Sequence, residues 1–136
     1  MKRVLIVDDQ PAFRTRLREM LTRAGLEVVA EAGGIPEAEA ALTTVEADLG
    51  VVDVMMPGIN GLEGTARLKK LKPELRIILI SALADHPADL RAAALRAGAE
   101  SFVAKDDLVL DRLRTWADAP AGPAPAAGCG GKETTS

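Results

Sequence analysis

The sequence predicts an α/β fold in which a parallel sheet is covered by helices on both faces. Five short apolar runs alternate with segments that carry apolar residues at helical spacing, and together they occupy residues 1–118. Strands that alternate with helices pair in parallel through right-handed crossovers. The composition agrees, because 48% hydrophobic and 27% charged residues in a chain of 136 suit one globular domain with a real core.

The first two strand and helix units follow from their apolar patterns. Val4–Val7 is a branched apolar run that stops at two carboxylates, as a strand buried on both faces does. Pro11 suits a first helical turn, and apolar residues then recur at helical spacing up to Gly25. Residues 26–31 mix apolar and acidic side chains like a half-exposed edge strand, and residues 35–45 resume the helical period.

The third unit is less regular. Leu49–Val54 is expected to be a strand, with Gly50 as a weak position inside it. Residues 57–61 contain the proline and glycines of a loop. The helix that follows is expected to bury a stripe made of Leu62, Ala66 and Leu71.

The last two units complete the pattern. Ile77–Ile80 is the fourth predicted strand, and an alanine-rich helix runs from Pro87 to Gly98. Phe102–Ala104 is the fifth strand. The final helix is expected to bury Val109, Leu113 and Trp116.

The chain after the predicted domain has a different composition. Residues 119–131 are Ala, Pro or Gly except for Cys129, and five polar residues follow. Such a segment neither propagates a helix nor buries apolar area. We therefore expect a domain at residues 1–118 and a flexible tail at residues 119–136.

Charge and cysteine content exclude several classes of protein. A net charge of -3 and 2% aromatic residues provide neither a basic field nor stacking platforms, so no direct binding of nucleic acid is expected. A single cysteine forms no internal disulfide, which favours the cytoplasm. Residues 4–7 are too short an apolar run for a signal peptide, and no run approaches the roughly 18 residues of a membrane span.

Polar residues follow four of the predicted strands. They are Asp8 and Asp9 after the first, Asp53 after the third, Ser81 after the fourth and Lys105 after the fifth. The carboxyl ends of parallel strands share one edge of the sheet, where ligands bind. Clustered carboxylates need a cation, and an all-oxygen ligand set suits Mg²⁺. With a lysine and a hydroxyl beside it, a carboxylate there has what phosphoryl transfer needs.

These residues, in this order, resemble the receiver domain of two-component response regulators. The motifs are Val-Asp-Asp at 7–9, Asp-Val-Met-Met-Pro-Gly at 53–58, Gly-Leu-Glu at 61–63, Ser-Ala at 81–82, and Gly-Ala at 98–99 leading to Phe102 and Lys105. The resemblance implies a flavodoxin-like, CheY-like fold with strand order 2-1-3-4-5.

The resemblance also implies a role for each residue. Asp53 is the expected phosphoacceptor, assisted by Ser81 and Lys105, and Phe102 occupies the aromatic switch position. Mg²⁺ is the expected cofactor. Its expected ligands are Asp8 (through a water), Asp9, Asp53 and the backbone carbonyl of Met55. Met55 and Leu83 flank the path of the attacking water, and because both are apolar the phosphorylated state should be long-lived.

The expected function is a signalling switch that catalyses only its own phosphorylation and the hydrolysis of its aspartyl phosphate. The phosphoryl donor is a histidine kinase or histidine phosphotransfer protein. Output is expected through the fourth helix, fifth strand and fifth helix, roughly residues 84–117, and a phosphorylation-dependent homodimer is among the expected partners. Two alternatives remain: a receiver-like scaffold that works without phosphorylation, and a metal-dependent phosphatase on a similar sheet.

Two departures from the family pattern affect the last loop and the switch. Asp106 and Asp107 follow Lys105 where the family often has proline, which leaves the geometry of the Lys105–Asp106 bond open and is similar to receivers of the NarL type. Phe102 stands where a tyrosine would add a hydroxyl able to hydrogen-bond. We expect the switch to work with a different bias.

Overall fold

A five-stranded parallel sheet in the order β2-β1-β3-β4-β5 forms the centre of the computed structural model, which describes residues 1–82 and 88–118. The strands are Arg3–Val7 (β1), Glu27–Ala32 (β2), Leu49–Asp53 (β3), Arg76–Ser81 (β4) and Ser101–Ala104 (β5). The helices are Pro11–Arg23 (α1), Ile35–Leu42 (α2), Gly61–Leu71 (α3), Ala88–Arg96 (α4), the 3-10 helix Lys105–Asp107 (η1) and Leu110–Asp118 (α5). The predicted α/β class and strand order are confirmed.

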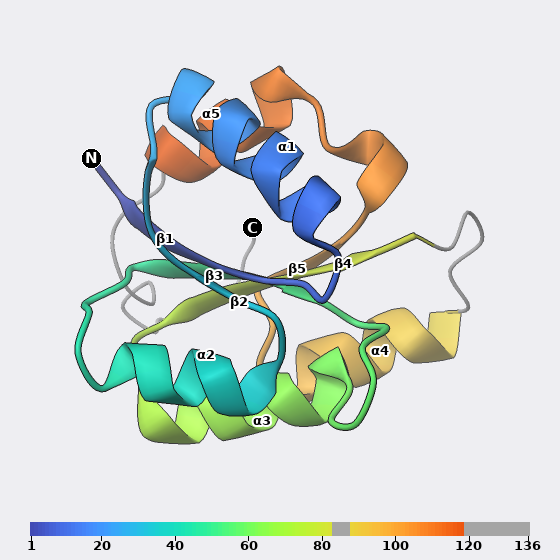
Figure 1. Ribbon diagram of the computed structural model, residues 1–136. Helices are drawn as coiled ribbons and strands as arrows, with labels where there is room; N and C mark the ends of the chain where they lie inside the picture. The colour runs from blue at the N-terminus through green and yellow to red at the C-terminus, as the bar shows by residue number, and fades with distance from the viewer. Residues whose placement is uncertain (83–87, 119–136) are drawn as a thin grey trace.

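Helices cover both faces of the sheet, with α1 and α5 on one face and α2, α3 and α4 on the other (Figure 1). Successive residues of a strand point to opposite faces. In β1, Leu5 and Val7 join the core under α2 to α4, whereas Val4 and Ile6 join the core under α1 and α5. All four are fully buried. This burial on both sides explains why the central strands are continuous apolar runs.

The buried face of α3 differs from the predicted stripe. Ala66 and Leu71 are exposed, and the helix buries Gly61, Gly64, Thr65 and Leu68 instead. The reason is a close approach between helices: a Cβ at Gly64 would clash with the side chain of Ile35 in α2. A glycine on the contact face lets the two helices meet, and it is invisible to a search for apolar periodicity.

A smaller prediction, for the last helix, is also corrected. Val109 is 54% exposed, because α5 begins only at Leu110 and Val109 lies in the turn after η1, while Leu113 and Trp116 are buried as expected. β3 pairs with β1 and β4 through Gly50 without a shift of register, so the glycine leaves the strand continuous.

The fold places the ends of β1, β3, β4 and β5 along one edge of the sheet. The predicted tail at residues 119–136 and the start of the fourth helix at Pro87 lie outside the described residues, so the boundary at residue 118 stays a prediction. Within the described residues, no helix is both long and apolar enough to span a membrane.

Candidate functional site

Three carboxylates meet at the carboxyl edge of the sheet. Asp8 and Asp9 directly follow β1, and Asp53 ends β3, the neighbour of β1. One carboxylate oxygen from each lies within 4.8 Å of those of the other two. Asp8 and Asp53 are buried, whereas Asp9 is exposed. The sheet therefore gathers the predicted acidic residues into one cluster that opens to solvent at Asp9.

Backbone hydrogen bonds orient the two buried carboxylates. Oδ1 of Asp8 accepts from the N–H of Gln10 at 2.8 Å, and Oδ1 of Asp53 accepts from the N–H of Met55 at 3.1 Å. In each case the side chain turns back onto the residue two positions later, as Asp commonly does at the start of a turn. Arg14 of α1 also donates to the backbone carbonyl of Asp8. One oxygen of each carboxylate is thus fixed by the loop that carries it.

Gly61 lets α3 approach the strand that carries Asp53. Its N–H donates to the carbonyl of Val54 at 2.9 Å. A Cβ at this position would lie 2.5 Å from the carbonyl oxygen of Asp53 and 2.8 Å from Cα of Val54, distances that no side chain tolerates. The glycine therefore sets how tightly the β3–α3 loop closes around Asp53.

Lys105 supplies the positive charge of the site. It follows β5 as the first residue of η1, and its Nζ lies 2.8 Å from Oδ2 of Asp8 and 3.4 Å from Oδ2 of Asp53. The contact with Asp8 is an ion pair whose angles do not fit a hydrogen bond. The contact with Asp53 is a long hydrogen bond. The same ammonium lies 4.0 Å from the ring centroid of Phe13 in α1. η1 is the form that the loop after Lys105 takes in place of a Lys-Pro turn.

The pKa of Asp53 is raised from 3.8 to about 6. Burial is the main cause, and the negative charge of Asp8 adds to it, whereas the N–H of Met55 and the ammonium of Lys105 act in the opposite direction. The site as built thus disfavours a charge on Asp53. An additional cation beside this carboxylate would reverse that preference.

Ser81, Phe102 and Met55 lie around this cluster in different ways. Ser81 is fully buried at the end of β4 and is in register with Ala104, the residue before Lys105. The ring of Phe102 is 3% exposed and already belongs to the core under α2 to α4, with the guanidinium of Arg91 5.7 Å from its centroid. Met55 is 59% exposed beside Asp53.

The donor set fits a hard divalent cation. Carboxylates are oxygen donors, the ligands that Mg²⁺ and Ca²⁺ prefer, and the exposed position of Asp9 leaves room for the waters that Mg²⁺ retains. Oδ2 of Asp8 is buried and makes no hydrogen bond in the described structure, and it pairs with the ammonium of Lys105, which a metal ion could replace. Two contributors were not identified as such from the sequence. Phe13 is one of the apolar residues at helical spacing in the first predicted helix, and Gly61 was noted only as a loop glycine and as part of a motif.

Comparisons with known proteins agree with this geometry. A family model described as the response regulator receiver domain matches residues 4–115. A putative transcriptional regulator from Pseudomonas aeruginosa is 39% identical over 113 residues, which is 83% of this chain and 54% of that protein. The chain thus spans about half the length of this relative.

Two solved structures share the fold and hold ligands. The response regulator TrrA from Thermotoga maritima, in complex with Mg²⁺ and beryllofluoride, is 35% identical with a TM-score of 0.72, covering 87% of this chain and 97% of that one. A response regulator from Burkholderia pseudomallei with a phosphorylated aspartic acid and a calcium ion is 26% identical with a TM-score of 0.73, covering 83% of this chain and 64% of that one.

Proposed function

Because the chain belongs to the response regulator receiver domain family, we propose that Asp53 is the residue through which it works as the phosphoacceptor switch of a two-component phosphorelay. The observation that carries this assignment is the position of Asp53: it is buried at the end of the central strand β3, between two further carboxylates and the ammonium of Lys105. Receiver domains are signalling switches. Catalysis of its own phosphorylation and dephosphorylation is part of the proposal.

The proposed reaction transfers a phosphoryl group from a phosphohistidine. A carboxylate oxygen of Asp53 attacks phosphorus in line, the phosphorus–nitrogen bond breaks, and its electron pair returns to the imidazole, which takes up a proton. Lys105 lies 3.4 Å from Oδ2 of Asp53, where its ammonium would contact an oxygen of the transferred group. Ser81, at the end of the neighbouring strand β4, is the proposed second donor.

Asp8, Asp9, Asp53 and the backbone carbonyl of Met55 are the proposed ligands of a divalent cation, and Mg²⁺ is the ion we propose. When bound, it would neutralise charge on the equatorial phosphoryl oxygens. The three side chains then have separate tasks. Asp53 holds the nucleophilic oxygen, buried Asp8 exchanges its pairing with Lys105 for the cation, and exposed Asp9 orders the waters at the mouth of the cluster.

Labelling with acetyl phosphate tests this function and separates it from two others. Intact mass should show a single labile addition to the parent in Mg²⁺ buffer and none to Asp53→Asn or in the presence of a chelator. No addition to the parent would support a phosphorylation-independent scaffold. Release of free phosphate without any addition would support a phosphatase. Asp111→Asn, which changes an exposed carboxylate in the first turn of α5, is the matched control and should label like the parent.

The proposal also covers location and partners. We place the protein in the cytoplasm, with a histidine kinase or histidine phosphotransfer protein as the phosphoryl donor and a homodimer that forms upon phosphorylation.

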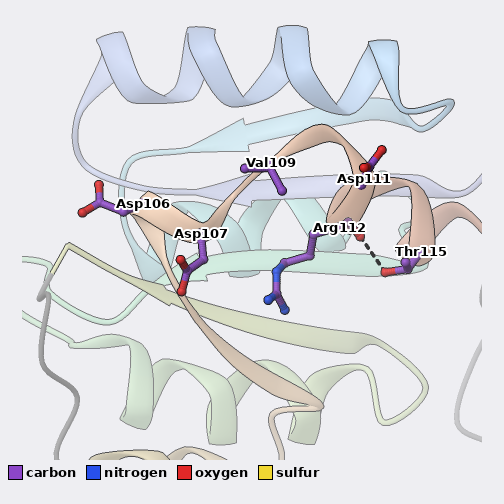
Figure 2. A pocket seen from close by; sticks show the side chains of 6 residues that line it. All are labelled: Asp106, Asp107, Val109, Asp111, Arg112 and Thr115. Carbon is purple, nitrogen blue, oxygen red and sulfur yellow. Dashed lines mark hydrogen bonds between the residues drawn. The ribbon is translucent and has the colours of Figure 1, made fainter.

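The proposed output face is built from α4, β5 and α5. One part of it is an open pocket of about 460 Å³. Figure 2 shows exposed Val109 between the acidic side chains of η1 and that of Asp111 in α5. The residues that line the pocket are Asp106, Asp107, Val109, Asp111, Arg112 and Thr115.

Beryllofluoride, which mimics the phosphorylated carboxylate, tests that face. A phosphoryl group shifts an equilibrium only through contacts that differ between two states. Lys105 connects Asp53 to η1, so new contacts at its ammonium should reach the start of α5. Amide NMR signals of residues 88–117 should change upon addition of Mg²⁺ and beryllofluoride. Changes confined to the loops of Asp8 and Asp53 would contradict this choice of face.

A further inference from the structure

The ammonium of Lys105 is held by an aromatic ring as well as by carboxylates. Its Nζ lies 4.0 Å from the ring centroid of Phe13, within the roughly 6 Å over which a cation is attracted to an aromatic face. Phe13 belongs to the first turn of α1, four residues after Asp9. The β1–α1 segment therefore delivers two carboxylates and a ring to the same lysine.

The ring is also anchored in the core. Phe13 is half-buried and packs against the cluster under α1 and α5, which includes Leu108 and Leu113. Lys105 lies three residues before Leu108. The packing of Phe13 in this cluster therefore holds α1 against the β5–α5 segment beside the ammonium. The ring thus has a fixed position relative to both Asp8 and Lys105.

The carboxylates alone fix the ammonium weakly. Its contact with Asp53 is long, at 3.4 Å, and its contact with Asp8 lacks hydrogen-bond angles. A lysine side chain has many rotamers and loses much entropy when it is fixed. Both carboxylates would also change partners when a divalent cation and a phosphoryl group arrive, whereas a phenyl ring binds neither.

We propose that Phe13 is a positioning residue for Lys105, its ring face holding the ammonium over Asp53 after the carboxylates have turned to a cation. The inference rests on the proposed function and extends it to a residue outside the polar cluster. It assigns the ring a role that the packing of α1 does not require. A leucine would fill much of the same space but would offer no negative face to the ammonium.

Beryllofluoride binding in Mg²⁺ buffer, followed by NMR, provides the main test. Phe13→Leu should weaken binding about threefold to thirtyfold, the range that a cation–aromatic contact of this kind spans. Phe13→Tyr and Phe13→Trp should bind like the parent, because both keep an aromatic face. Affinity for Mg²⁺ alone should not fall in Phe13→Leu, since the ring contacts the ammonium and is no ligand of the ion. The dispersion of the amide NMR signals checks that each variant is folded.

A double-mutant cycle with Lys105→Met separates positioning from packing. In that background Phe13→Leu should cause no further loss of binding, because the ammonium is gone. The Cε protons of Lys105 provide a second readout that needs no ligand: the ring should shift their NMR signals upfield in the parent, and the shift should disappear in Phe13→Leu.

Three results would overturn the inference. They are equal binding by the parent and Phe13→Leu, a loss that persists with Lys105→Met, and a tyrosine variant as weak as the leucine variant. A parent that takes up no beryllofluoride at all contradicts the proposed function, and with it the role of Phe13. If the parent binds beryllofluoride and Phe13→Leu binds it equally well, only the positioning role is contradicted.

Discussion

The ammonium of Lys105 and the fully buried carboxylate of Asp8 form an ion pair at 2.8 Å, although neither residue is near the other in sequence. The pair joins the end of β5 to the end of β1, across β3 and β4. It also occupies the Asp8 oxygen that has no hydrogen bond. Lys105 therefore balances the charge of the acidic cluster when no metal ion is bound.

Lys105→Met should lower the stability of the metal-free protein and raise its affinity for Mg²⁺. Removing the ammonium leaves the buried carboxylate of Asp8 without its partner. We expect this to cost about 1–3 kcal/mol of stability, because Asp53 can take up a proton and so reduce the negative charge of the cluster. The lost ammonium no longer competes with a cation for Asp8. Urea unfolding and Mg²⁺ titration measure the two effects.

The control for that variant is Lys72→Met. Lys72 pairs with exposed Glu46 at 3.8 Å on the surface, where an ion pair contributes little. Both stability and Mg²⁺ affinity should match the parent. A Lys105→Met protein that binds Mg²⁺ no more tightly than this control would show that the ammonium does not compete for the carboxylates.

Asp53→Asn should stabilise the metal-free protein at neutral pH. Its pKa is raised to about 6 from 3.8, so the folded state binds a proton that the unfolded state releases. The stability linked to that proton is fully present below about pH 4 and is lost as pH rises through 6. Asn stays neutral, so its advantage over the parent should grow across this window to about 1–3 kcal/mol above pH 7.

Urea unfolding between pH 4 and 8 in the presence of a chelator measures this difference. Asp111→Asn, an exposed carboxylate, should follow the parent at every pH. Mg²⁺ should reverse the order at neutral pH, because a bound cation favours ionised Asp53. If the free energies of unfolding of Asp53→Asn and the parent differed by the same amount at every pH, the raised pKa of Asp53 would be contradicted.

Gly61→Ala should damage the site as well as the fold. Its Cβ would lie 2.5 Å from the carbonyl oxygen of Asp53, which is a backbone atom and cannot turn aside as a side chain could, so the loop must move. We expect a cost of about 1–3 kcal/mol, typical of overpacking, and slower labelling by acetyl phosphate.

Gly50→Ala is the matched control within the same strand and loop unit. Its Cβ would meet Cδ2 of Leu75 at 3.7 Å, an ordinary contact. Alanine in a strand loses less entropy than glycine, so stability should be unchanged or rise by up to about 0.5–1 kcal/mol. Equal losses for Gly61→Ala and Gly50→Ala would show that the close approach at Gly61 is not what limits the loop.

The strands and the cluster of acidic residues were predictable from sequence because both follow from local patterns. β1 and β4 are buried on both faces and are therefore continuous apolar runs, and the polar residue after each run lies at the ligand-binding edge. Strand order is different: periodicity does not say which strands pair, and the order came from the resemblance alone.

The errors and omissions come from contacts between elements. The stripe predicted for α3 failed because Gly64 packs against Ile35 and carries no apolar signal of its own. Val109 was misplaced because the start of α5 depends on η1. The contact between Phe13 and Lys105 joins residues that are distant in sequence, so no spacing rule could reveal it.

Met55→Asn should shorten the lifetime of the phosphorylated state. Met55 is 59% exposed beside Asp53, and its thioether cannot order a water for attack on phosphorus. An amide could do so, and a positioned nucleophile lowers the barrier to transfer. Only the side chain changes, so the Met55 N–H that donates to Asp53 is kept. Leu83, the second predicted position, lies outside the described residues.

The measurement is loss of label in Mg²⁺ buffer after acetyl phosphate is removed. We expect Met55→Asn to lose phosphate several-fold faster than the parent, and Met55→Leu, which stays apolar, to match the parent. The comparison separates water ordering from bulk, because leucine and asparagine both shorten the side chain. If the leucine variant were as fast as the asparagine variant, access past a shorter side chain would control hydrolysis. If the parent were as fast as both, water would reach Asp53 by a path that Met55 does not cover, and the exposed mouth of the cluster at Asp9 would be the place to block it.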